Sequence, residues 1–343
     1  MKLNIVPRFW NSTGAPLAVS NEQSEDRDHK LSNFISGLRP QSLKYLETIS
    51  DTGIGAEAFL ALNTHGESLK ELRLCLRTDT LPHLSLLRGC TAIETLRLED
   101  NDGHTDIKAT QNDVFLEVIE WLRKCEDLKN FSLTNFVDAA AIVFPLLLEE
   151  KIHLRKLDID TYVVNSNKMF HQALIHQRES LRALTLSGDS DEMFRDDVDV
   201  LVDSLKSLTE LRELELRGVS DWLKDEHFNQ IIDRLDKLED FYISGLEVTD
   251  AVLDKAASLR NLRSMTFMVM SKFTLDGLLE FVSKLGPGNQ GLVLLIGMAD
   301  PGALLSEDEL SLVRESLMVK VGGRLEYTPW RDPDVSEFEG DSD

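Results

Sequence analysis

Hydrophobic residues recur along the chain in a six-residue pattern, with leucine or a related residue at the first, fourth and sixth positions. "LRALTL" at Leu181 and "LRELEL" at Leu211 are clear copies. Successive copies begin 24 to 35 residues apart. The first residues of the ten copies are Leu43, Leu69, Ile93, Leu128, Leu154, Leu181, Leu211, Leu238, Leu262 and Leu292. In an extended strand the fourth and sixth side chains share a face. The pattern therefore predicts stacked parallel strands above a common aliphatic floor.

The segments between these copies carry a helical period instead. The apolar residues of Asp113–Cys125, Asp196–Leu208 and Asp225–Leu238 recur every three or four positions, which is typical of amphipathic helices. Each repeat is therefore predicted to be a strand, a loop, a helix and a second loop. Because a helix is bulkier than a strand, stacking is expected to curve the array with the sheet inside.

Repeats of this length with a full helix resemble the ribonuclease-inhibitor-like class of leucine-rich repeats. The irregular intervals, and Cys90 and Cys125 three positions before Ile93 and Leu128, most resemble the repeat halves of fungal F-box proteins. This resemblance implies an α/β leucine-rich-repeat solenoid, with a curved parallel sheet on the concave side and helices on the convex side.

The predicted organisation is a single solenoid over residues 1–330, with about ten or eleven repeats. Residues 331–343 form an acidic tail that is predicted to be disordered. We expect an acidic solvated loop near 11–30, including Asn21–Lys30. The long interval after Ile93 predicts a loop insertion near 101–112, which is either functional or merely tolerated.

The first residues match the end of one more strand. Leu3 and Ile5 are two positions apart, and Leu3 is the counterpart of Leu46 in the next copy. We therefore expect residues 2–6 to pair with the strand near Leu43–Thr48. The resemblance implies an upstream F-box, and whether one was lost or never present is open. Without it, direct binding to a Skp-type adaptor is not expected.

The charge of the chain excludes several partners. Sixty acidic residues against 37 basic ones give a formal net charge of -23, which disfavours binding to nucleic acid or to an anionic membrane. No secretory signal or membrane-spanning run is present, and three cysteines are too few for a disulfide framework. These features predict a cytoplasmic or nuclear protein. Cys90 and Cys125 fall at the buried turn of the repeat, which favours packing over reactivity.

No arrangement of residues predicts catalysis. Asp189–Asp197 superficially resembles a calcium loop, but Met193 and Phe194 replace an oxygen ligand and a glycine. His171 and His176 lack the spacing of a zinc protease, and no phosphate-binding or nucleophile motif is present. We therefore expect no enzymatic activity, no metal and no cofactor.

The polar residues between the leucines are predicted to point out of the concave sheet. The candidate partner-binding residues are Arg73, Arg97, Glu99, Lys156, Asp158, Thr185, Glu215, Arg217, Asp240, Tyr242, Thr266 and Met268. This face is either a protein-binding surface or a solvated face with no ligand. Tyr242 and Met268 supply apolar contact, so the C-terminal part is the expected hot spot.

Three functions remain open at this point. The resemblance favours a protein-interaction module that recognises substrates for a Skp–cullin–F-box ubiquitin ligase. The alternatives are a stand-alone scaffold or inhibitor, or a regulator similar to Ran GTPase-activating proteins. In each case we expect a monomer that binds a protein whose identity the sequence does not give.

Overall fold

The computed structural model describes residues 2–5, 21–48, 53–103, 106–137, 139–164, 167–188 and 195–330. The chain divides into two compact units. Unit 1 contains Met1–Tyr162 with Glu179–Leu181, and unit 2 contains Val163–Arg178 with Arg182–Asp343. That the two units form one continuous solenoid stays a prediction, and the predicted disordered tail, 331–343, lies outside the described residues.

Unit 1 alternates strands with helices, and its strand order follows the chain order. Its strands are β1 (Lys2–Ile5), β2 (Tyr45–Thr48), β3 (Glu71–Leu76), β4 (Thr95–Asp100), β5 (Asn130–Thr134) and β6 (Lys156–Tyr162). Its α-helices are α1 (Asn21–Gly37), α2 (Ala56–Leu62), α3 (Ile107–Thr110), α4 (Asn112–Arg123) and α5 (Ala139–Leu147), with 3-10 turns η1 (Asn63–His65) and η2 (Leu81–Leu87).

Unit 2 repeats the same alternation. Its strands are β7 (Ala183–Gly188), β8 (Glu213–Arg217), β9 (Asp240–Thr249), β10 (Ser264–Lys272), β11 (Val293–Ala299) and β12 (Arg324–Pro329). Its α-helices are α6 (Lys168–Ala173), α7 (Arg195–Leu205), α8 (Asp225–Ile232), α9 (Asp250–Ala256), α10 (Leu275–Lys284) and α11 (Glu307–Val321). Its 3-10 turns are η3 (Leu174–Gln177), η4 (Pro287–Asn289) and η5 (Pro301–Ala303).

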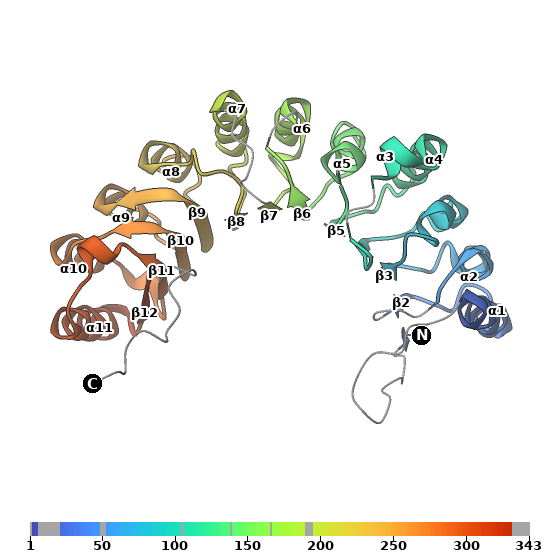
Figure 1. Cartoon of the computed structure of the whole chain (residues 1–343), viewed down its shortest axis with the longest axis horizontal. Helices are drawn as coiled ribbons and strands as arrows, with labels where there is room; N and C mark the ends of the chain where they lie inside the picture. The colour runs from blue at the N-terminus through green and yellow to red at the C-terminus, as the bar shows by residue number, and fades with distance from the viewer. Residues whose placement is uncertain are drawn as a thin grey trace, which may run out of the picture. The chain divides into compact units, whose positions relative to one another are not determined.

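The repeated leucines form in-register ladders beneath each sheet. In unit 1, equivalent buried positions are Leu46, Leu72, Leu96, Phe131 and Leu157. In unit 2 they are Leu184, Leu214, Phe241, Met265, Leu294 and Leu325. In each unit the parallel strands line the inner, concave side and the helices line the outer, convex side (Figure 1). The predicted leucine-rich-repeat solenoid fold is confirmed.

The predicted first strand is also confirmed. Strand β1 pairs in parallel with β2, and its register places Leu3 opposite Leu46 and Ile5 opposite Thr48. The two-residue spacing of apolar side chains was therefore sufficient to recognise an incomplete copy of the motif.

The prediction that Asn21–Lys30 is a solvated loop is wrong. This segment opens the 17-residue helix α1. The Asp28 carboxylate accepts hydrogen bonds from the backbone N–H groups of Gly55 (2.8 Å), Glu57 (2.9 Å) and Ala58 (3.1 Å). These are donors at the start of α2 that have no partner within that helix, so one acidic side chain caps the neighbouring helix. Residues 11–20 lie outside the described residues.

The insertion at 101–112 is not wholly a loop either. It contains the short helix α3, whose N-cap residue Asp106 accepts a hydrogen bond from the Ala109 N–H at 2.7 Å. Ile107 is buried, at 3% exposure, and anchors this helix to the unit. Residues 104 and 105 lie outside the described residues.

The last two repeats begin differently from the prediction. The sequence pattern predicts a copy that starts at Leu292, but β10 pairs with β11 so that Met265 lies opposite Leu294. The copy therefore starts one residue earlier, at Gly291, and buries Leu294 and Ile296. A further copy, which the sequence search missed, starts at Gly322 and forms β12. In both copies a glycine replaces the first leucine, which hid the correct frame.

Substitutions in β7 test the assigned register. Leu184 is fully buried, whereas the neighbouring Thr185 is partly exposed on the opposite side. Leu184→Ala is expected to lower the free energy of unfolding by about 2–5 kcal/mol because it leaves a cavity. Thr185→Ala should stay within about 0.5 kcal/mol of neutral. Equal losses in urea denaturation would show that the register is wrong.

A buried histidine predicts acid sensitivity. His171 in α6 is 0% exposed, and burial lowers its pKa to about 4, although Asp197 opposes the shift. The unfolded imidazole titrates near pH 6.5, so its contribution to stability is complete above that pH and is lost as the pH falls towards 4.

As the pH falls from 7 to 4.5, His171 should lower the free energy of unfolding by about 2–3 kcal/mol. The measurement is urea denaturation at both pH values for the native chain and for His171→Gln, which cannot titrate. A variant that loses as much stability as the native chain over this range would assign the acid sensitivity to other groups.

Candidate functional site

Each unit presents a strand face, which we define as the surface formed by the outward side chains of its strands. All twelve predicted residues lie on these faces, and each is partly or fully exposed while its neighbours along the strand are buried. The structure divides them, with Arg73, Arg97, Glu99, Lys156 and Asp158 in unit 1 and the other seven in unit 2. Each strand face is therefore a separate candidate surface.

Some outward positions depart from the pattern because they are buried, among them Tyr45, Ala183 and Ser244. Ser244 is buried, at 9% exposure, and its hydroxyl donates to the Leu216 carbonyl at 2.9 Å. It also accepts a hydrogen bond from the Gly218 N–H at 2.5 Å. Gly218 has a φ of 57°, and a Cβ there would lie 2.4 Å from the Gly188 carbonyl oxygen, so only glycine fits. The glycine that follows the strand motif is therefore required by the backbone turn that leads from the strand towards the helix.

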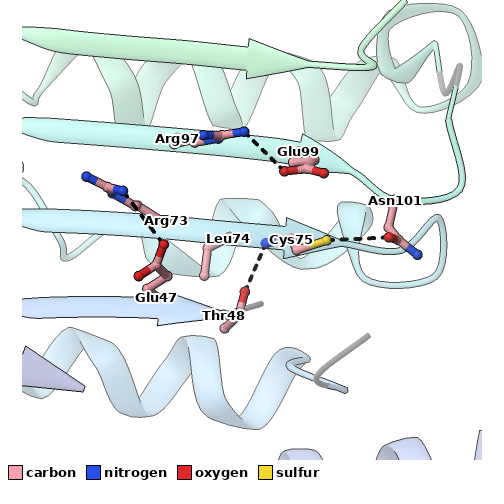
Figure 2. A pocket seen from close by; sticks show the side chains of 8 residues that line it. All are labelled: Glu47, Thr48, Arg73, Leu74, Cys75, Arg97, Glu99 and Asn101. Atoms are coloured by element: carbon pink, nitrogen blue, oxygen red, sulfur yellow. Dashed lines mark hydrogen bonds and ion pairs between the residues drawn. The ribbon is translucent and has the colours of Figure 1, made fainter. Parts of the chain in front are cut away.

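On unit 1, a hollow of about 340 Å³ opens over β2, β3 and β4 (Figure 2). Its lining residues are Glu47, Thr48, Arg73, Leu74, Cys75, Arg97, Glu99 and Asn101. Three of them, Arg73, Arg97 and Glu99, were predicted. Arg73 and Arg97 lie opposite each other in the register of β3 and β4.

Nearby carboxylates neutralise the charges of Arg73 and Arg97 to different extents. An Arg73 Nη atom lies 2.6 Å from a Glu71 carboxylate oxygen, and its other Nη lies 3.7 Å from Glu47. Among the described residues, the ion-pair contact of Arg97 is to Glu99, at 3.5 Å, which is longer than the closest contact of Arg73. Like charges in opposite positions of neighbouring strands are destabilising, and the carboxylates beside Arg73 offset part of this repulsion.

Tyr45 and Glu47 are functional candidates that the sequence search missed. The Tyr45 hydroxyl donates to the Glu47 carboxylate, and the Arg73 guanidinium carbon lies 6.0 Å from the Tyr45 ring centroid. Burial and the Glu47 carboxylate raise the pKa of Tyr45 to about 12. The outward positions of the weak "LKYLET" copy could have identified both residues.

On unit 2, an aromatic ring and a guanidinium stack. The Arg217 guanidinium carbon lies 4.6 Å from the Tyr242 ring centroid, and an Arg217 Nη lies 2.7 Å from a Glu215 carboxylate oxygen. This cation–π contact holds two predicted residues together on adjacent strands. Burial raises the pKa of Tyr242, so its phenol stays protonated at neutral pH.

An acidic group flanks this pair. Burial raises the pKa of Asp240, and Glu213, Glu239 and Glu215 add electrostatic repulsion that raises it further. Glu213 lies directly opposite Asp240 in the register of β8 and β9. This part of the strand face therefore carries crowded negative charge next to the stacked Arg217.

On β11 the outward side chains of unit 2 are apolar, and they lie beside the charged Arg324 and Glu326 of β12. The register places Val293 opposite Ser264 and Leu295 opposite Thr266, so both point outward, and both are partly exposed. A Cβ on Gly297 would lie 2.2 Å from the Met268 sulfur, so this glycine leaves the room that the thioether occupies. The sequence search missed Val293 and Leu295 because its frame for this strand was one residue off.

The described residues offer little for catalysis. They contain no group of three or more His, Cys, Asp or Glu side chains that could hold a metal ion. Cys90 and Cys125 are fully buried, and burial raises the pKa of each thiol to about 12. Their thiols are therefore protonated and unreactive at neutral pH. Over the same ranges, no helix has the length and apolar character needed to cross a membrane.

Comparison with known proteins shows similarity in fold. No family profile and no curated protein matches the chain. Among solved structures it is similar to an internalin from Listeria monocytogenes, at 14% identity over 84% of this chain and 81% of that one, with a TM-score of 0.47. It is similar to the Rad7 and Elc1 complex in yeast, at 16% identity over 89% of this chain and 67% of that one, with a TM-score of 0.48. It is also similar to the leucine-rich-repeat protein LegL7 from Legionella pneumophila, at 13% identity over 84% of this chain and 94% of that one, with a TM-score of 0.45. Likenesses this distant carry no functional information.

Thiol labelling tests the strand face of unit 1. Cys75 is partly exposed in the hollow, whereas Cys90 and Cys125 are buried. We expect iodoacetamide to modify Cys75 in the native protein and the other two only after denaturation, as read by peptide mass spectrometry. Modification of Cys90 or Cys125 at a comparable rate in the native state would contradict the assigned burial.

Proposed function

We propose that this chain is a non-enzymatic protein-binding module and that the strand face of unit 2 makes its principal contact. One observation carries the proposal: Tyr242, Met268, Val293 and Leu295 lie outward on consecutive strands β9, β10 and β11. Val293 and Leu295 thereby extend the seven predicted residues of unit 2 by two apolar residues. Arg217, Glu215 and Asp240 border the apolar residues with charge.

This composition matches the energetics of protein interfaces. Binding energy concentrates in a few aromatic, arginine and apolar side chains that become fully desolvated, while a polar rim excludes water. Tyr242 supplies a large apolar ring, and Arg217 is already held over it, so less side-chain freedom is lost when a partner binds. A folded face of polar and apolar side chains without metal ligands fits a protein partner better than a chemical reaction.

The narrower role that we propose is recognition of a substrate for a Skp–cullin–F-box ubiquitin ligase, in the cytoplasm or nucleus. It is supported by the repeat lengths and the placement of Cys90 and Cys125, which resemble fungal F-box proteins. A stand-alone scaffold or inhibitor is the second candidate. Recovery of a Skp-type adaptor with the full chain would favour the first role, and a client protein without an adaptor would favour the second.

Substitutions on β8 and β9 test the proposed contact. Tyr242→Ala and Arg217→Glu should each abolish recovery of the partner in affinity purification with mass spectrometry, because they remove the aromatic anchor or reverse the charge stacked on it. Both side chains are outward, so the melting temperature should fall only slightly, although Arg217→Glu places a carboxylate beside Glu215. Arg314→Glu, on helix α11 of the same unit, is the matched charge reversal and should retain the partner.

A different pattern of losses would overturn the assignment. If the partner survives Tyr242→Ala and Arg217→Glu but is lost when residues 101–112 are replaced by a Gly/Ser linker, the insertion and not the strand face carries binding.

A further inference from the structure

A second hollow on the strand face of unit 1 is built around β5. It has a volume of about 500 Å³, and its lining includes Arg97 from β4, Asn130 and Ser132 from β5, and Lys156 and Asp158 from β6. Arg97 lies opposite Ser132 and Lys156 lies opposite Asn130, so the two cations are two strands apart and offset by two residues, with roughly 12 Å between their Cα atoms. The shorter Asn130 and Ser132 side chains form the polar floor between them.

Both cations act electrostatically on Asp158, but neither makes a close ion pair with it among the described residues. Glu99 is the one carboxylate within ion-pair distance of Arg97 in the described ranges, and its 3.5 Å contact exceeds the 2.7–2.9 Å of a strong charge-assisted hydrogen bond. Lys156 is exposed and forms no ion pair with the described residues. Both cations therefore retain donor capacity on this face, in a chain with a formal charge of -23.

The two acidic residues of the hollow are already engaged. Glu71 pairs with Arg73 at 2.6 Å. Asp158 accepts a hydrogen bond from the Ser132 hydroxyl at 3.2 Å, and burial raises its pKa. The lining contains the three cations Arg73, Arg97 and Lys156, and the carboxylates of Glu47 and Glu99 approach Arg73 and Arg97 from outside it. A single carboxylate adds less negative charge beside Asp158 and Glu71 than a phosphate dianion would.

We propose that this hollow binds a glutamate or aspartate side chain from an acidic segment of a protein partner, seated over β5 between Arg97 and Lys156. The Arg97 guanidinium offers a planar fork of N–H donors to the two carboxylate oxygens, and Lys156 offers a mobile point charge. Asn130 has an amide donor within the same hollow, one N–H of which is already used by the Thr95 hydroxyl at 3.0 Å. This inference rests on the proposed function, and it assigns the partner chemistry of a different surface from the apolar face of unit 2.

The test is fluorescence polarisation at low salt with a capped Gly/Ser peptide that carries glutamate at alternate positions and a neutral dye. The full chain should bind this peptide at least about fivefold more tightly than the same peptide with glutamine. Arg97→Gln and Lys156→Gln should each raise its Kd about two- to fivefold, without a change in melting temperature. Added salt should weaken binding, because exposed charges are screened.

Lys151→Gln is the matched control. It removes the same charge from the same unit, at a residue paired with Glu126 at 2.5 Å outside the hollow, and should leave the Kd unchanged. The proposal is overturned if the glutamate and glutamine peptides bind equally, or if Lys151→Gln weakens binding as much as Lys156→Gln does. A phosphoserine peptide that binds more tightly than the glutamate peptide would also overturn it, in favour of a phosphate site.

The outcome is separable from that of the proposed function. If the glutamate peptide shows no preference while Tyr242→Ala still abolishes recovery of the natural partner, the hollow fails and the protein-binding role stands. If the partner survives Tyr242→Ala but glutamate binding depends on Arg97, the apolar contact surface fails and the acid-binding hollow stands.

Discussion

The constraint on which this structure depends is that one repeat cannot bury its own apolar side chains. A short strand with every second residue apolar is stable only when a parallel neighbour in the same register continues the aliphatic floor. Leu72 opposite Leu96, and Leu214 opposite Phe241, show this requirement being met strand after strand within each unit. Because the buried positions fix the register, the alternate positions must project outward in rows. These rows of outward side chains are therefore available to bind a partner, and their placement requires no folding free energy beyond that of the repeat itself.

On the helical side, acidic residues also join each repeat to the next. Asp225, at the start of α8, accepts a hydrogen bond from the Thr249 N–H at 3.0 Å, and Thr249 is the N-cap of α9. Asp250 in turn accepts from the N–H of Thr274, the N-cap of α10, at 3.0 Å. Each carboxylate lies where the partial positive charge of a helix start favours it. Part of the chain's large negative charge thus joins successive repeats, and only the remainder limits which partners it can bind.

The sequence predicted the fold well where leucine occupied the motif and poorly where another residue replaced it. Gly291 and Gly322 at the first motif position hid the frame of β11 and the existence of β12, and with them the outward Val293 and Leu295. The acidic composition of Asn21–Lys30 suggested a loop because its low hydrophobicity masked a helix that is fixed by Asp28 capping its neighbour. Outward positions followed from strand periodicity, so all twelve candidates lie on strand faces. Their side-chain pairing, such as Arg217 over Tyr242, depends on neighbouring strands and could not be derived from one motif at a time.

The central claim is that the strand face, and not the helical side, is where a partner binds. Hydroxyl-radical footprinting with mass spectrometry tests it directly, because radicals oxidise methionine and tyrosine according to their exposure. In unit 2, Tyr242 and Met268 lie on the strand face, whereas Met169 and Met318 are exposed on helices α6 and α11, at 65% and 58%. The account predicts that partner addition protects Tyr242 and Met268 and leaves Met169 and Met318 oxidised as before. Protection of the two helical methionines, with Tyr242 and Met268 unchanged, would contradict it.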